Sequence, residues 1–371
     1  MSISRRQFLF LVCTAALGSA LGVNTLLQQA GAHDAPLYLY SASDNETGGH
    51  FLSQLNLHTG QLKQQALPFR GHALIPLAEQ QVILFGRRPG TQCVVADFKQ
   101  SQVNTFSAAA KRHFGGHGCL SKDRQVLFTT ENDYEGKRGV LGIRDRQNLQ
   151  VLGEYETYGM DPHDIHLMPD GKTLVIANGG IETHPDFGRR KLNISTMQPS
   201  LVYLDADNGK KLEEYRLPDH QLSIRHLNVS EQGDVGVALQ FEGNLYHRQP
   251  ASLVAWQPAG GTLQLLSIGG TDVPLFKGYM ADLAFDSKQQ ILAVTSPRGK
   301  QVSFWNIAAQ QFLYASTLPE PSGIAFLQDQ QVFLVSDAKG GVHTIKATLE
   351  GAEVETLYQF EDQHWDNHLL A

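Results

Sequence analysis

Helical periodicity is almost absent from this 371-residue sequence, because its apolar residues form short runs broken by turn residues rather than recurring every three or four positions. The chain also lacks an excess of basic residues, with 30 Lys and Arg against 37 Asp and Glu. Nucleic acid and an anionic membrane surface are therefore not expected as partners. A nucleophile elbow, a phosphate-binding loop and a zinc-protease helix are missing as well, which makes an enzyme less expected without excluding one.

The N-terminus has the pattern of an export leader. Arg5 and Arg6 belong to a twin-arginine motif, a moderately apolar stretch follows at residues 8–23, and an Ala-Gly-Ala cleavage site comes after it. We expect residues 1–32 to be a signal peptide and residues 33–371 to reach the periplasm already folded. A stable membrane anchor is the less favoured alternative, since the apolar stretch is short for a span.

Cysteine is scarce, with three in the whole chain. Cys13 falls inside the leader, so the exported part keeps only Cys93 and Cys119. These two could pair in an oxidising periplasm. Two separately buried thiols are the alternative, and the sequence leaves both open.

A unit of strand, polar turn and strand recurs about every 48 residues along the rest of the chain. Its seven copies lie at residues 54–67, 94–106, 142–155, 202–217, 253–268, 302–318 and 342–360. Each full unit opens with two further short apolar runs, which makes four strands in all. Four short strands per unit are typical of a β-propeller blade. The sequence therefore predicts an all-β, seven-bladed β-propeller that occupies residues 33–371.

The two ends of this propeller are expected to share one blade. Residues 37–67 supply three strands, and residues 366–371 supply one more opening strand. A blade built from both termini closes the ring and removes the exposed sheet edges that an open ring would have.

Histidine is concentrated at one register of the opening strands. Counted from the apolar residue before each turn, this register holds His72, His117, Asp164, His226, Asp282 and Gly323, with His368 close to the same place in the last copy. With 15 histidines in the chain, chance would place about 0.3 of them in seven such positions. Because the opening strand is the innermost of a blade, these side chains should meet at the mouth of the central channel.

A ring of imidazoles and carboxylates from separate blades suits a transition metal. We expect the ligands to come from His72, His117, His163, Asp164, His166, His226 and Asp282. Iron or copper is the expected cofactor, although imidazole also suits zinc and the residues do not identify the metal. The alternative is that these histidines are structural and hydrogen-bond within or between blades.

Two long insertions, at residues 179–200 and 241–250, are expected on the face of the propeller where the histidines lie, with a shorter one at 131–138. Side chains in and near the long insertions that could bind an anionic ligand are His184, Arg189, Arg225, Tyr246, His247 and Arg248. A local positive potential can attract an anion to a protein of negative net charge. The alternative is that these side chains are simply solvated.

Five segments carry a more specific pattern: residues 130–134 (TENDY), 161–166 (DPHDIH), 177–186 (ANGGIETHPD), 197–203 (MQPSLVY) and 222–227 (LSIRHL). Together with the twin-arginine leader, they resemble an uncharacterised domain-of-unknown-function family of exported bacterial propellers. Members of that family are typically encoded beside imelysin-type, iron-regulated periplasmic proteins and a di-haem cytochrome-like oxidoreductase. The resemblance implies a role in iron acquisition or handling, with other periplasmic iron-uptake proteins as partners. It transfers no catalytic residue.

Three functions of different classes stay open on the sequence alone. The first is a periplasmic propeller that binds a transition metal or a metal chelate at a His/Asp-lined channel mouth. The second is a scaffold for partner proteins, with structural histidines. The third is a hydrolase or isomerase for a small ligand at the same mouth, where a histidine beside an aspartate acts as general base. A resident metal, a copurifying partner or turnover would distinguish them.

Overall fold

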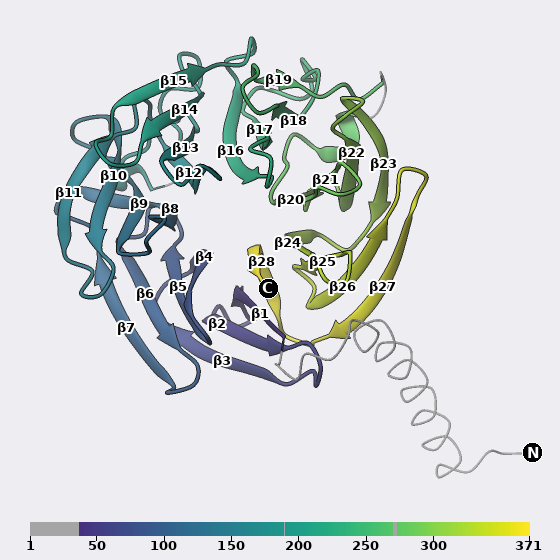
Figure 1. The fold of residues 1–371 in the computed structure, drawn as a ribbon, viewed down its shortest axis with the longest axis horizontal. Coiled ribbons are helices and arrows are strands. Elements are labelled where there is room, and N and C mark those ends of the chain that lie inside the picture. The colour runs from purple at the N-terminus through teal and green to yellow at the C-terminus, as the bar shows by residue number, and fades with distance from the viewer. Residues whose placement is uncertain (1–36, 189, 270–272) are drawn as a thin grey trace, which may run out of the picture.

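The computed structural model describes residues 37–188, 190–269 and 273–371, so the leader expected at residues 1–32 lies outside the described residues. Seven four-stranded antiparallel sheets stand around a central axis (Figure 1). This arrangement confirms the predicted seven-bladed β-propeller. In the described part of the chain, no helix has the length and apolar character needed to cross a membrane.

Each blade is one sheet, and its first-named strand is the innermost. Blade 1 consists of β28 (His364–Leu370), β1 (Tyr38–Asp44), β2 (His50–Asn56) and β3 (Leu62–Leu67). Blade 2 consists of β4 (Gly71–Ala78), β5 (Gln81–Gly86), β6 (Gln92–Asp97) and β7 (Gln102–Ser107). Blade 3 consists of β8 (Arg112–Leu120), β9 (Val126–Asp133), β10 (Arg138–Asp145) and β11 (Val151–Glu156). Blade 4 consists of β12 (Pro162–Leu167), β13 (Thr173–Asn178), β14 (Ser200–Asp205) and β15 (Lys211–Tyr215).

The remaining blades follow the same order. Blade 5 consists of β16 (Leu222–Val229), β17 (Val235–Phe241), β18 (Val254–Gln257) and β19 (Gln264–Leu265). Blade 6 consists of β20 (Leu283–Asp286), β21 (Ile291–Ser296), β22 (Gln301–Asn306) and β23 (Gln311–Thr317). Blade 7 consists of β24 (Pro321–Leu327), β25 (Val332–Asp337), β26 (Gly341–Ala347) and β27 (Ala352–Gln359). Two single-turn 3₁₀ helices, η1 (Pro185–Phe187) and η2 (Val273–Phe276), lie in connections.

The apolar core lies between the blades rather than inside one sheet. Second strands such as β25, with the sequence VFLVSD, are buried along their whole length because both faces are covered by neighbouring blades. Outer strands such as β11 alternate between half-buried and exposed residues, since one face meets water. The largest fully buried side chain among the described residues, Trp305, packs in a cluster that extends through blades 4, 5 and 6. Burial between blades therefore holds the inner strands in fixed positions around the axis.

The predicted closure of the ring is also confirmed. The C-terminal strand β28 pairs antiparallel with β1, with Ser43 opposite Trp365 and Asp44 opposite His364. Both termini therefore contribute to blade 1. The strand begins at His364, two residues earlier than the sequence pattern indicates.

Deleting residues 364–371 should open this blade. The deletion removes the buried Trp365 and leaves β1 without its inner partner. We expect the melting temperature to fall by at least about 10 °C, because several kcal/mol of apolar burial are lost. Circular dichroism measures the change, with deletion of Ala371 alone as the control. Equal melting temperatures for the eight-residue deletion and the parent chain would contradict the closure.

The inner strands are irregular where they pass the axis. Pairing with the second strand shifts register between Phe114 and Gly118 in β8, between Pro162 and Asp164 in β12, and between Ile224 and His226 in β16. A β-bulge turns the side chain of the extra residue away from its regular direction. The bulges therefore determine which side chains of each inner strand face the channel.

Candidate metal centre

Five histidines meet on the axis of the propeller, one from the inner strand of each of five consecutive blades. They are His368 (β28), His72 (β4), His117 (β8), His163 (β12) and His226 (β16), and all five side chains are buried. In this order around the axis, the centroids of adjacent imidazoles lie 4.6 to 5.0 Å apart. We call this set the histidine ring.

Four members of the ring are close enough to share one metal ion. His72, His117, His226 and His368 each offer a nitrogen, and these four atoms lie within 4.8 Å of one another. The Nε2 atoms of His117 and His368 are 3.1 Å apart, and those of His163 and His226 are 3.0 Å apart. Two imidazole nitrogens bound to one metal at 2.0–2.1 Å lie about 2.9 to 3.4 Å apart at angles between square and tetrahedral. The closest pairs already have this separation.

Two members of the ring contact buried carboxylates through their second nitrogen. His72 Nδ1 lies 3.0 Å from Asp366, and His368 Nδ1 lies 3.3 Å from Asp282. A histidine that donates its Nδ1 hydrogen to a carboxylate keeps the Nε2 lone pair free for a metal, as in known metal sites. Burial opposes ionisation of Asp366, but Arg87 and His72 outweigh it and hold the pKa of that carboxyl well below its usual range.

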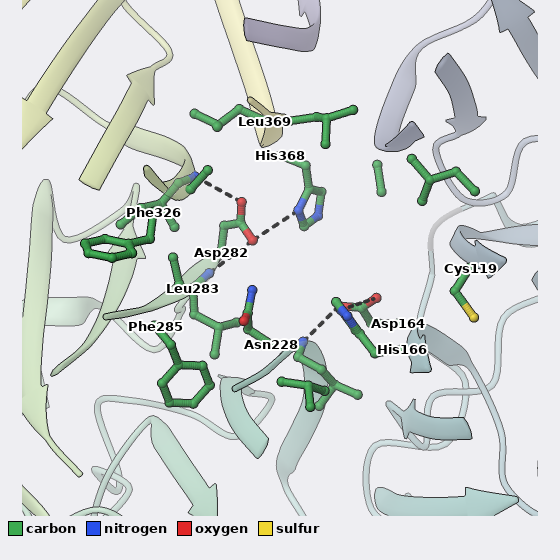
Figure 2. A pocket seen from close by; sticks show the side chains of 18 of the residues that line it. Cys119, Asp164, His166, Asn228, Asp282, Leu283, Phe285, Phe326, His368 and Leu369 are labelled. Carbon is green, nitrogen blue, oxygen red and sulfur yellow. Dashed lines mark hydrogen bonds and ion pairs between the residues drawn. The ribbon is translucent and has the colours of Figure 1, made fainter. Parts of the chain in front are cut away.

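Asp164 and Asp282 also join neighbouring blades. Asp164 Oδ2 accepts the Leu227 backbone N–H at 2.8 Å, and Asp282 Oδ2 accepts the Ile324 backbone N–H at 3.0 Å. Figure 2 shows Asp282 beside His368, and Asp164 beside His166. His166, about a third exposed, lies 3.7 Å from Asp164. These three predicted ligands therefore stand next to the histidine ring, and their present contacts are blade-to-blade and ion-pair contacts.

Most of the ring is uncharged at neutral pH. Burial lowers the pKa of His117 to about 3 and lowers the pKa values of His72, His163 and His226 well below the ordinary 6.5. Burial also acts on His368, but Asp282 outweighs it and raises the pKa of that imidazole. The Nδ1 atoms of His117, His163 and His226 have no partner among the described residues. The neutral imidazole is the form that binds metals.

Two glycines make room for this arrangement. A Cβ on Gly116, which has a φ of +111°, would lie 2.7 Å from Cδ2 of His72. Gly323 occupies the equivalent register of blade 7, where a Cβ would lie 2.6 Å from the backbone nitrogen of Leu369. The backbone of β28 thus occupies the space that a side chain at this position of blade 7 would need, and blade 7 adds no side chain to the ring.

The channel widens on the side where the inner strands end. A cavity of about 400 Å³ is lined there by residues from the inner strands of all seven blades, among them His117 and His368. Figure 2 shows part of this lining, including His368. Asp164 and Asp282 line it as well, so its inner end is acidic. The cavity thus leads from solvent to the histidine ring and has room for a hydrated cation.

Cys119 lies beside this cavity and Cys93 is fully buried, and both are free thiols. Burial raises the pKa of each thiol above its ordinary value. Both thiols therefore stay protonated at neutral pH, and neither is expected to act as a nucleophile or as a thiolate ligand.

The residues predicted to bind an anion fall into two groups. Arg225 is buried and lines a small pocket on the opposite side of the ring. Four others line neither this pocket nor the large cavity: His184, Tyr246, His247 and Arg248. Tyr246 is fully exposed, and Arg248 forms an ion pair with Asp219. Arg189 lies outside the described residues.

Three important residues of the site are not among the predicted ligands. The sequence places His368 only near the common register, because the pairing of β28 shifts register between Trp365 and Leu369. Asp366 and Arg87 act through contacts that bridge blades 1 and 2. The repeat could have indicated His368, whereas no repeated signal marks the other two.

Comparisons with solved structures support the fold alone. The chain is similar to the "Kuenenia stuttgartiensis Hydrazine Synthase" structure, with a TM-score of 0.61 and 13% identity over 82% of this chain and 89% of that one. It is also similar to a chain of the "Crystal Structure of Mitotic Checkpoint Complex", with a TM-score of 0.54 and 11% identity over 74% and 73% of the two chains. At such low identity the likeness extends to the architecture and not to the site. Among curated proteins, no sequence matches this chain.

A family model described as "Protein of unknown function (DUF1513)" matches residues 65–371, which include every member of the histidine ring. The expected resemblance to a domain-of-unknown-function family is thereby confirmed, while twin-arginine export and the neighbouring genes stay predictions. The chain belongs to the DUF1513 family.

Proposed function

We propose that this protein binds a transition-metal ion, iron or copper, in the histidine ring. The observation that carries the proposal is the set of four buried imidazoles, from four different blades, whose nitrogens lie within 4.8 Å of one another. A donor set made of neutral imidazoles suits first-row transition metals and excludes a preference for Mg²⁺ or Ca²⁺, which bind oxygen.

A purely structural role for the ring is less favourable. Buried polar atoms normally have hydrogen-bond partners, and each unsatisfied one costs about 1–3 kcal/mol. Three Nδ1 atoms of the ring lack a partner among the described residues. Histidines that tie blades together would direct these atoms to backbone carbonyls, as His364 Nδ1 does toward Ala338 O at 2.7 Å. The ring instead directs its imidazoles toward one another.

The acidic cavity is the route by which the cation reaches the ring. It opens to solvent, its inner end carries Asp164 and Asp282, and it ends at His117 and His368. On the opposite side of the ring lies a pocket that is lined by arginines and has a volume of only about 20 Å³. A cation is attracted to the first side and repelled from the second.

The proposed setting is the periplasm, reached by the twin-arginine route. There the protein takes part in iron acquisition or handling, with other periplasmic iron-uptake proteins as partners. The leader sequence and the family resemblance support this setting, and the histidine ring supplies the chemistry that such a role requires.

Titration of the metal-free protein with Fe(II), Cu(II) and Zn(II) tests the metal site. We expect one ion per chain and a dissociation constant below about 1 µM for at least one of them. The Cu(II) complex should show electron paramagnetic resonance couplings to several nitrogens. Weaker binding of all three metals, or a Cu(II) signal without nitrogen couplings, would contradict the proposal.

A further inference from the structure

A small pocket lies on the side of the histidine ring where the inner strands begin. The residues that line it are His72, Arg87, Arg88, Gly115, His163, Arg225, His226, Tyr279 and Asn367. Its volume of about 20 Å³ is enough for one occupant of the size of a water molecule. Three members of the ring therefore separate this pocket from the acidic cavity.

The arginines that line the pocket outnumber the carboxylates that pair with them. Arg88 and Arg225 both form ion pairs with Asp161, and Arg87 forms one with Asp366. Three guanidinium groups thus share two carboxylates. Asp366 has two more partners, a member of the histidine ring and another arginine that is partly exposed at the surface.

Arg225 provides the observation that points to a ligand. Its side chain is 8% exposed, yet its Nε atom has no partner in the part of the chain that the structure describes. A buried N–H group without an acceptor is rare in folded proteins. An anion in the pocket would accept this hydrogen and compensate the excess positive charge.

We propose that this pocket binds a small monovalent anion, of the size of chloride, next to the metal in the histidine ring. Arg225 donates its Nε hydrogen to the anion, and Arg87 and Arg88 supply further positive charge. The volume excludes sulfate and phosphate, which are several times larger than a water molecule. Anion binding does not depend on the proposed metal site. Only the coupling between anion and metal rests on it.

Metal and anion should strengthen each other's binding. They have opposite charges, and only the imidazoles of the ring lie between their sites, in a buried region where charges interact more strongly than in water. Coupling of this kind is reciprocal, so an anion that raises metal affinity is itself bound more tightly when metal is present. Chloride therefore acts as an effector of metal retention.

Bromide is the probe for the anion site itself. Crystals of metal-free protein grown in bromide should show an anomalous peak within hydrogen-bond distance of Arg225 Nε, and crystals of Arg225→Gln should lack it. A water molecule in place of bromide in the parent protein would overturn the proposal. So would a bromide peak of equal height in the variant.

Zinc titration tests the coupling. At equal ionic strength, we expect Zn(II) to bind the parent protein at least about 5-fold more tightly in chloride than in perchlorate. Arg225→Gln should bind Zn(II) with the same affinity in both salts, while Arg248→Gln, in an exposed loop, should keep the difference. Equal affinities in the parent protein, or a difference that persists in Arg225→Gln, would overturn the coupling. Failure of Zn(II) to bind in either salt would instead contradict the metal site, which the bromide measurement does not require.

Discussion

A chain with both His117→Ala and His226→Ala should lose metal affinity by on the order of 10⁴-fold. Four-ligand zinc sites supply about 10–16 kcal/mol, so two ligands represent about 5 kcal/mol or more. His117 and His226 come from blades 3 and 5, and both belong to the four-nitrogen cluster. Equilibrium dialysis with Zn(II) and Cu(II) measures the loss.

Two further variants make this result specific. The pair His117→Gln and His226→Gln keeps polar side chains of similar size, so loss of metal in that variant reports ligand removal rather than a cavity. The pair His220→Ala and His247→Ala removes two exposed imidazoles and should leave affinity unchanged. Retention of metal by the Gln variant at parental affinity would show that the ring is not the site.

Acid should destabilise the metal-free protein strongly between about pH 6.5 and pH 5. Burial lowers the pKa of His117 to about 3 and lowers those of His72, His163 and His226 well below 6.5. In the unfolded chain these imidazoles take up protons near pH 6.5, while the folded ring does not. Their contribution to stability is therefore complete above pH 6.5 and is lost as pH falls, by up to about 1.4 kcal/mol per pH unit for each histidine.

The raised pKa of His368 acts in the opposite direction. Its contribution is fully present below pH 6.5 and is lost as pH rises through the raised value, so it lowers stability above pH 6.5 and leaves the losses at acidic pH unchanged. Urea unfolding at pH 5, 6, 7 and 8 in the presence of a chelator measures the net effect. The His117→Gln and His226→Gln double variant should show a shallower dependence on pH. Constant stability of the parent chain from pH 5 to pH 7 would mean that the ring titrates normally.

The fold was predictable because it repeats. Seven copies of one strand pattern indicate seven blades, and equivalent positions in the inner strands must face one channel. The register argument therefore found His72, His117 and His226, which the structure brings together. His163 was found only as a neighbour of Asp164, since the bulge in β12 makes it an extra residue of the strand.

The rest of the site depends on contacts between blades that the repeated sequence pattern does not indicate. Arg88 and Asp161 are far apart in sequence and pair only when blades 2 and 4 both reach the axis. The two sides of the ring also could not be told apart from the sequence. The long insertions were expected to surround the channel mouth at which the histidines meet. The acidic cavity is instead lined by the inner strands and the turns that follow them.

The closing strand β28 carries His368, which lies 3.1 Å from His117, a residue 251 positions earlier in the chain. The proposed metal site is therefore incomplete until β28 has been synthesised and has paired with β1. A chain interrupted anywhere before β28 would lack this ligand and could not acquire the ion in the same way. An ion bound there would link distant parts of the chain as a cross-link does, and it would stabilise the closed ring. On this proposal, a chain that includes β28 would retain the metal more tightly than a chain that lacks it.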